Sequence, residues 1–136
     1  MIPNEFILMA ALIWALFVHF VVDFMLQRHE IAVNKWNSFP HLLCHAIEYS
    51  AGLLVGCSFF MGTQPFYMAN LMLDKVFLLA GINGASHLAI DFITSKFSHK
   101  YFSKQDWHNG FVVVGFDQFL HTSILIASIL KLFDLT

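Results

Sequence analysis

Four long apolar stretches, separated by short polar connections, dominate this sequence. We expect them at residues 6–27, 40–61, 76–95 and 111–133. Each stretch is long enough to cross the roughly 30 Å hydrocarbon core of a bilayer as a helix. The predicted fold is therefore all-α: an integral membrane protein in which four transmembrane helices form a bundle, with a single domain over residues 1–136.

The apolar pattern is interrupted by pairs of histidine and aspartate residues, and the members of each pair stand four residues apart. These pairs are His19 and Asp23, His41 and His45, His87 and Asp91, and Asp117 and His121. A spacing of four places two side chains on the same face of a helix, one above the other. At a rise of about 1.5 Å per residue, all four pairs fall in the same half of the predicted bundle. We expect the eight side chains to converge at one level.

Burying these groups in lipid would be costly. A lone aspartate near the middle of a spanning helix costs on the order of 3 kcal/mol. Three aspartates together with Glu48 would cost roughly 10 kcal/mol if all of them faced acyl chains. We therefore expect these side chains to face one another, water or a metal ion. Hydrogen bonding between helices, without further chemistry, is the simpler alternative.

The residue types favour a metal site. Imidazole nitrogens and carboxylate oxygens are the ligands of zinc, manganese and non-haem iron, and helix bundles build such sites from inward-pointing side chains. All eight residues of the four pairs are candidate ligands of a divalent ion, with zinc as the first choice and manganese or iron as alternatives. They suit two ions about 4 Å apart, or one ion with further carboxylates that orient its histidines. Gln27 and Gln118 are expected to hydrogen-bond the ligands.

Composition and charge narrow the class of protein further. The chain is 58% hydrophobic and 12% charged, with a mean hydropathy of +0.68, which is unlike a soluble domain. A net charge of −2 and the absence of a basic run give no case for nucleic-acid binding. Cys44 and Cys57 show no CxxC spacing, so we interpret them as core thiols. The N-terminus lacks the positive flank of a signal peptide, and we expect the first stretch to be retained.

The basic residues predict an orientation in the inner membrane. The connections after the first and third stretches hold Arg28, Lys35, Lys96, Lys100 and Lys104, whereas Lys75 and Lys131 lie towards the other side. By the positive-inside rule, these two connections are cytoplasmic and both termini lie outside. The three lysines of the connection after the third stretch recur every four residues, which fits either contact with anionic head groups or a solvated helix face.

The first and third stretches also share a motif. His19-x3-Asp23-Phe24 matches His87-x3-Asp91-Phe92, and the stretch after each begins with a second pair that ends in histidine. A duplicated helical hairpin would explain this match.

With these positions the chain resembles an uncharacterised family of small bacterial and phage membrane proteins that carries only a domain-of-unknown-function label. The likeness runs over nearly the whole chain. Its residues are His19, Asp23, Phe24, Gln27, His41, His45, His87, Asp91, Asp117, Gln118 and His121. The resemblance implies a polytopic membrane protein with a polar signature and no assigned activity. In kind, more distantly, the chain also looks like predicted membrane-bound metal-dependent hydrolases.

Together these observations predict a membrane-embedded metal-dependent hydrolase that acts on a lipid or another amphiphile from the cytoplasmic leaflet. The ion would lower the pKa of a bound water to around 7, and a carboxylate, Asp117 or Glu48, would act as the catalytic base. A divalent-cation or proton transporter, and a structural or host-interaction membrane protein, are the alternatives. Bis-histidine haem fits the paired aspartates less well. The expected partners are membrane lipids and a lipid-like substrate. A homo-oligomer is a further possibility.

Overall fold

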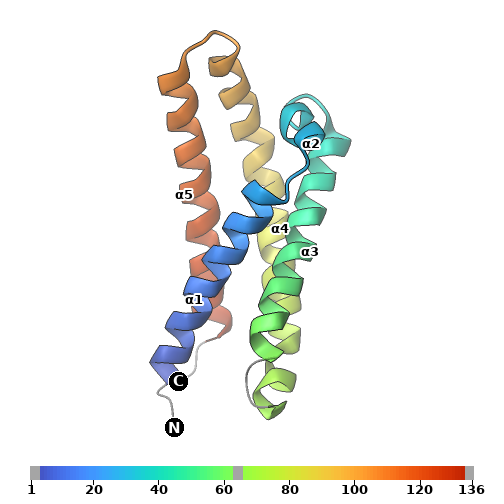
Figure 1. The fold of residues 1–136 in the computed structure, drawn as a ribbon, viewed down its shortest axis with the longest axis vertical. Coiled ribbons are helices and arrows are strands. Elements are labelled where there is room, and N and C mark those ends of the chain that lie inside the picture. The colour runs from blue at the N-terminus through green and yellow to red at the C-terminus, as the bar shows by residue number, and fades with distance from the viewer. Residues whose placement is uncertain (1–3, 63–65, 134–136) are drawn as a thin grey trace.

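The chain folds into helices throughout the part that the structure describes. This computed structural model describes residues 4–62 and 66–133 (Figure 1). Its elements are α1 (Asn4–Phe20), a π-helical turn η1 (Val21–Met25), α2 (His29–Asn34), α3 (Phe39–Gly62), α4 (Phe66–Phe102) and α5 (Trp107–Leu132). No strand is present in these ranges.

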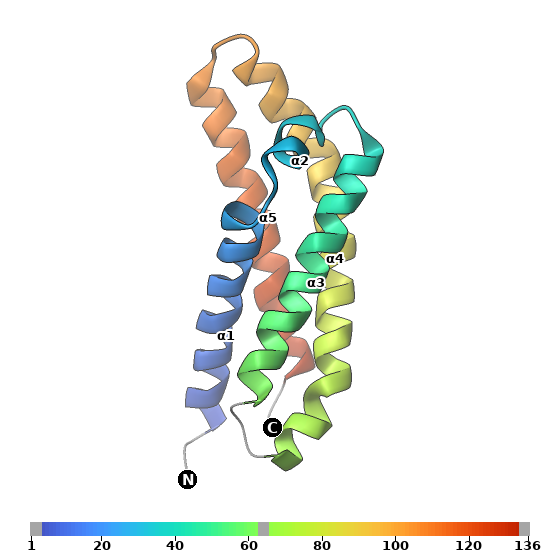
Figure 2. The ribbon, with the colours of Figure 1, turned by 45° about the vertical axis from the view of Figure 1, so that its right-hand side comes forward.

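Four of the helical segments are long and apolar enough to cross a membrane. They run over Phe6–Met25, Phe39–Phe60, Leu73–Phe102 and Trp107–Leu132. Figures 1 and 2 show them packed as a bundle in which α1 begins and α5 ends at one end, while α2 and the α4–α5 turn lie at the other. Many large apolar side chains, among them Phe17, Phe77 and Phe119, point outward and are more than half exposed. The predicted all-α membrane bundle is thereby confirmed.

The third span is longer than the 76–95 stretch expected from the apolar pattern. α4 continues to Phe102, so Lys96 and Lys100 lie on a helix rather than in a connection. No glycine or proline occurs between residues 85 and 102, and the helix has no local reason to stop earlier. The chain turns only at Gln105, which has a positive φ of 60°.

The turn between α4 and α5 is closed by one cap and one glycine. The carboxylate of Asp106 accepts hydrogen bonds from the backbone and the side chain of Asn109, at 3.2 Å and 2.7 Å, which caps α5 and lowers the pKa of Asp106. A Cβ on Gly110 would overlap with the ring of Phe102. The absence of a side chain there lets α4 and α5 approach closely beside the turn.

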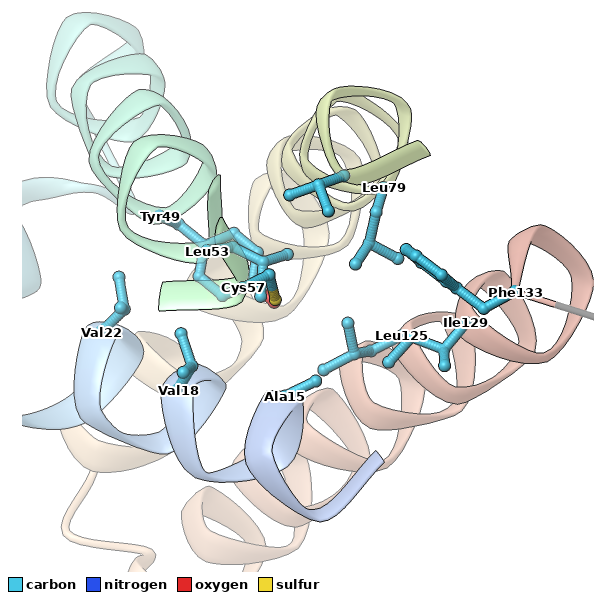
Figure 3. Close-up of a cluster of buried hydrophobic side chains, with 11 residues drawn as sticks. Ala15, Val18, Val22, Tyr49, Leu53, Cys57, Leu79, Leu125, Ile129 and Phe133 are labelled. Atoms are coloured by element: carbon cyan, nitrogen blue, oxygen red, sulfur yellow. The ribbon is translucent and has the colours of Figure 1, made fainter. Parts of the chain in front are cut away.

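The half of the bundle near the chain ends is filled by apolar side chains. Figure 3 shows Ala15 and Val18 of α1, Leu53 and Cys57 of α3, Leu79 of α4, and Leu125, Ile129 and Phe133 at the end of α5 pointing towards one another. A Cβ on Gly52 or Gly56 would lie 2.6 Å from a methyl group of Val22 or Val18. These two glycines therefore allow α1 and α3 to pack closely.

Candidate metal centre

The last turn of the first span places Asp23 inside the bundle. After Phe20 the helix widens into η1, in which the amide of Leu26 donates to the carbonyl of Val21 at 2.9 Å. Such single π-helical turns are rare, and they are frequent at functional sites. Val22 and Asp23 are the buried residues of this turn, and the Asp23 side chain is only 5% exposed.

Asp23 meets one histidine from α3 and one from α4. Nε2 of His45 lies 2.9 Å from Nε2 of His87, and Oδ1 of Asp23 lies 3.1 Å from the first and 3.3 Å from the second. Donor atoms bound to a tetrahedral ion at about 2.0–2.1 Å stand roughly 3.4 Å apart. All three residues are buried. This group could hold a metal ion.

Asp91 joins this group to a second one. Its Oδ2 lies 3.3 Å from Nε2 of His45 and 3.6 Å from Nε2 of His87, while its Oδ1 lies 3.6 Å from Nε2 of His121. His87, Asp91 and His121 form a second group whose ligand atoms all lie within 4.8 Å of one another. The two oxygens of Asp91 therefore face two neighbouring groups of possible ligands.

Two aromatic rings hold His87 in place. Its ring stacks on Tyr49 at a centroid distance of 4.1 Å and on His121 at 3.9 Å. Nδ1 of His87 and Nε2 of His121 are buried without a hydrogen-bond partner among the described residues. Nε2 of His121 nevertheless faces two carboxylate oxygens, Oδ1 of Asp117 at 3.3 Å and Oδ1 of Asp91 at 3.6 Å.

Two glutamine amides fix the orientation of the surrounding groups. Nε2 of Gln118 donates to Oδ2 of Asp23 at 2.9 Å and to Oδ2 of Asp117 at 3.1 Å. The amide of Gln27 hydrogen-bonds Nδ1 of His45 at 3.0 Å. The atom that faces the ring is the amide nitrogen Nε2, a donor. For His45 to bind an ion through Nε2 as a neutral imidazole, the amide has to turn over so that its oxygen accepts from Nδ1. The expected hydrogen bonds from both glutamines are confirmed.

His19 contacts the cluster without offering a free ligand atom. Its Nδ1 lies 3.0 Å from the hydroxyl of Tyr49, and its Nε2 lies 3.1 Å from Oε1 of Gln118. The residue is buried, at 3% exposure, as expected of a side chain that faces the bundle interior. It stands outside the two groups of ligand atoms and orients Gln118 between Asp23 and Asp117.

Two predicted site residues lie elsewhere. The ring of His41 hydrogen-bonds Oγ of Ser38 at 2.7 Å and approaches Glu30 at 3.7 Å. The carboxylate of Glu48 pairs with Arg28 at 2.6 Å, and this contact raises the pKa of the Arg28 guanidinium.

Helix geometry explains both placements. His41 precedes His45 by one turn, at the very start of α3, and so lies beyond the level of the cluster. Glu48 follows His45 by three residues and is turned by roughly 60° around the helix axis. The expected convergence of all four pairs therefore holds for every member except His41.

Three residues that contact the cluster were not expected there. Nζ of Lys35 lies 2.8 Å from Oδ2 of Asp91, and Oγ1 of Thr94 donates to Oδ1 of Asp117 at 2.5 Å. The third is Tyr49, which lies against both His19 and His87. Helical spacing could have found two of them, because Tyr49 follows His45 by four and Thr94 follows Asp91 by three. Lys35 had no such signal, since it lies in a connection.

A polar cavity of about 120 Å³ opens beside the cluster. Its walls carry the carboxylates of Asp23, Asp91 and Asp117, the ammonium of Lys35, and hydroxyl and apolar groups from α4 and α5. The volume is enough for several water molecules. Water or a small part of a substrate can therefore reach the ligand groups.

Comparison with known proteins identifies the family. The family described as a protein of unknown function (DUF3307) matches residues 11–136, and the chain belongs to it. No curated protein and no solved structure matches the chain. The resemblance to a domain-of-unknown-function family is thereby confirmed, whereas the likeness to metal-dependent hydrolases gains no support from these comparisons.

Proposed function

We propose that this member of the DUF3307 family is a membrane-embedded metal-dependent hydrolase that acts on a lipid or another amphiphile. The observation that carries the proposal is the triangle of Asp23 Oδ1, His45 Nε2 and His87 Nε2, with edges of 2.9–3.3 Å, beside a polar cavity. Three protein ligands with an accessible neighbouring position are typical of catalytic metal sites, whereas structural sites are closed by four.

Zinc fits the nitrogen and oxygen donors best, with manganese or iron as alternatives and room for one or two ions. When bound, such an ion would lower the pKa of a coordinated water to around 7 and would polarise the scissile group. The chain's own contribution is to fix the ligands: Gln27 orients His45, Tyr49 supports His87, and Gln118 holds Asp23.

Asp117 is the carboxylate best placed to accept a proton in the cavity. Its side chain is 14% exposed, compared with 5% for Asp23 and 3% for Asp91. Thr94 donates to its Oδ1, which also lies 3.3 Å from Nε2 of His121, and Gln118 donates to its Oδ2. These contacts orient the group, and Oδ2 keeps a lone pair that can accept a proton. Glu48 has no part in this mechanism, because its carboxylate pairs with Arg28 at the surface.

The surroundings of the cavity favour an amphiphilic substrate. Phe24, Val113 and Val114 line it together with the polar groups, and Phe24 is half exposed on the outside of the bundle. An acyl chain can therefore lie along the apolar wall while a polar linkage reaches the ligands. The basic residues gathered around this end support placing it at the cytoplasmic leaflet of the inner membrane.

The apolar half of the bundle argues for chemistry rather than transport. Beyond His121 the interior is occupied by Leu125, Ile129 and Phe133 of α5 and their neighbours. A transporter needs a polar route to both sides of the membrane, and ionisable groups along it. Among the described residues, the buried histidines and aspartates all lie in the half towards α2 and the α4–α5 turn, which supports a site entered from that end.

Metal content tests the ligand assignment. Detergent-purified protein is dialysed against zinc, then against buffer, and its metal is measured by inductively coupled plasma mass spectrometry. We expect zinc to be retained by the parent protein and lost from His45→Ala. His41→Ala is the matched control, because it removes a histidine from the same helix one turn away, and it should retain zinc. Equal zinc in both variants would overturn the assignment.

Turnover tests the reaction. The zinc-loaded protein is assayed in mixed micelles with para-nitrophenyl palmitate and with an alkyl para-nitrophenyl phosphate. We expect release of para-nitrophenol from one of them, dependent on zinc and abolished in Asp117→Asn with its metal retained. The hydrolase proposal fails if the protein binds zinc but turns over neither substrate. If the protein also carries zinc into proteoliposomes, it is a transporter instead.

A further inference from the structure

Lys35 reaches the cluster from outside the spanning helices. It directly follows α2, and its ammonium lies 2.8 Å from Oδ2 of Asp91 with the side chain 18% exposed. The same Oδ2 lies 3.3 Å from Nε2 of His45. It also lies 3.6 Å from Nε2 of His87, so this oxygen stands beside the triangle of Asp23, His45 and His87. An ion held in that triangle and the ammonium therefore compete for Oδ2 of Asp91.

The connection that carries Lys35 is anchored, so its side chain is the part that can move. The ring of Trp36 stacks on His99 of α4 with centroids 3.6 Å apart and planes 6° from parallel. Lysine has a flexible four-carbon stem and a strongly hydrated charge. Its ammonium can leave Asp91 and remain in the polar cavity, which Lys35 itself lines together with Ser95 and Ser98.

The charges around the cavity determine whether it can accept an anionic group. With the imidazoles neutral, as ligands of an ion are, three carboxylates and one ammonium leave two net negative charges around the site, which disfavour an anion. A divalent ion cancels them and frees the ammonium from its carboxylate partner. An anionic group of the substrate then meets the ion on one side and a lysine on the other.

We propose that Lys35 determines the specificity of this site: a divalent ion displaces its ammonium from Asp91, and the released ammonium binds a phosphate-type group of the substrate in the cavity. This inference rests on the proposed metal-dependent function and names its substrate class. A lysine ammonium is a common point-charge ligand of phosphate. The phosphate group can belong to a lipid head group or to a free phosphate compound.

Amine acetylation measures the exchange at a single residue. Detergent-purified protein with and without zinc is treated briefly with an N-hydroxysuccinimide acetate, and each lysine is quantified by mass spectrometry. Zinc should raise the acetylation rate of Lys35 several-fold, because the ion pair with Asp91 is broken. The exposed Lys100 and Lys104 are internal controls and should not change. An unchanged Lys35 rate in protein that retains zinc overturns the exchange while leaving the proposed function intact.

Zinc affinity gives a second readout. Lys35→Met should bind zinc several-fold more tightly than the parent, because no ammonium has to be displaced. Lys96→Met removes a lysine whose ammonium lies over Phe92, 3.6 Å from its ring centroid, and should leave the affinity unchanged. Equal or weaker affinity in Lys35→Met would contradict the competition. If neither the parent nor Lys35→Met binds zinc, this inference and the proposed function both fail.

The anion is tested on the zinc-loaded protein with the same acetylation readout. Inorganic phosphate is added in one arm, and in the other the protein is placed in nanodiscs of phosphatidylcholine with or without phosphatidic acid. Protection of Lys35 by phosphatidic acid alone identifies a lipid source, and protection by inorganic phosphate identifies a free one. Lack of protection in both arms overturns the role of Lys35 in substrate specificity.

Discussion

The two halves of this bundle are built from the same helices, but one has a polar interior and the other an apolar one. In α3 one buried face runs through His45, Tyr49, Leu53 and Cys57 in steps of four, and it changes from polar to apolar within two turns. The half towards α2 and the α4–α5 turn holds the ligand groups and a cavity of about 120 Å³. In the other half the cavity between α1, α3, α4 and α5 is only about 20 Å³.

From this difference we infer that the apolar half holds the fold together, whereas the polar half carries the proposed metal chemistry. The apolar half gains its stability from close packing, in which each lost methyl group costs energy. In the polar half, carboxylates, imidazoles and an ammonium surround the cavity of about 120 Å³. Burying such groups costs energy, but there they can bind an ion or a substrate. Substitutions in one half should therefore affect stability, and substitutions in the other should affect ligands.

The largest effect is expected from removing a ligand of the polar half. His87→Ala takes away the histidine shared by both groups, and we expect zinc affinity to fall at least about a hundredfold. Zinc should raise the midpoint of unfolding of the parent, because it binds the native state. It should leave the midpoint of His87→Ala unchanged. A zinc-dependent shift of normal size in this variant would break the division between the halves.

A cavity made in the apolar half should have the opposite effect: it should lower stability and leave zinc binding unchanged. Leu125 is fully buried among α1, α4 and α5, and Leu125→Ala should lower the free energy of unfolding by about 2–4 kcal/mol. Titration with sodium dodecyl sulfate, followed by circular dichroism, measures the loss. Zinc should still raise the midpoint of this variant, since its ligands lie one turn or more away. Loss of the zinc effect would mean that the halves are coupled.

Two glycines of α3 locate the border between the halves. A Cβ at Gly52 or at Gly56 would lie 2.6 Å from Val22 or Val18, so Gly52→Ala and Gly56→Ala should each cost about 1–3 kcal/mol of stability. Val22 adjoins Asp23 in the π-helical turn, whereas Val18 lies a turn further away. Zinc affinity should therefore fall in Gly52→Ala and hold in Gly56→Ala. If neither variant changed the zinc affinity, the border between the halves would lie closer to Asp23 than Gly52 does.

The sequence predicted the spanning helices and most of the cluster, for reasons visible in particular residues. Apolar length identified the four spans, and the four-residue spacing of His87 with Asp91 and of Asp117 with His121 placed those side chains on inward faces. The same spacing gave a wrong prediction for His41. It places His41 on the face of α3 that carries His45, but it does not show that the other helices have no ligand residues at the height of His41. It also missed Lys35, whose contact with Asp91 depends on how the α2–α3 connection folds back over the bundle.

The smallest effect should come from a glycine that neither half uses. Gly115 of α5 lies on the outside of the bundle, where an added Cβ would meet nothing within 4 Å. Gly115→Ala should stabilise the protein by at most about 1 kcal/mol, through the higher helix propensity of alanine, and leave zinc affinity unchanged. Detergent unfolding and a zinc titration measure both quantities. A loss of stability instead would show that this outer face is covered in the membrane, for instance by a second copy of the chain, and would place a third functional surface beside the two halves.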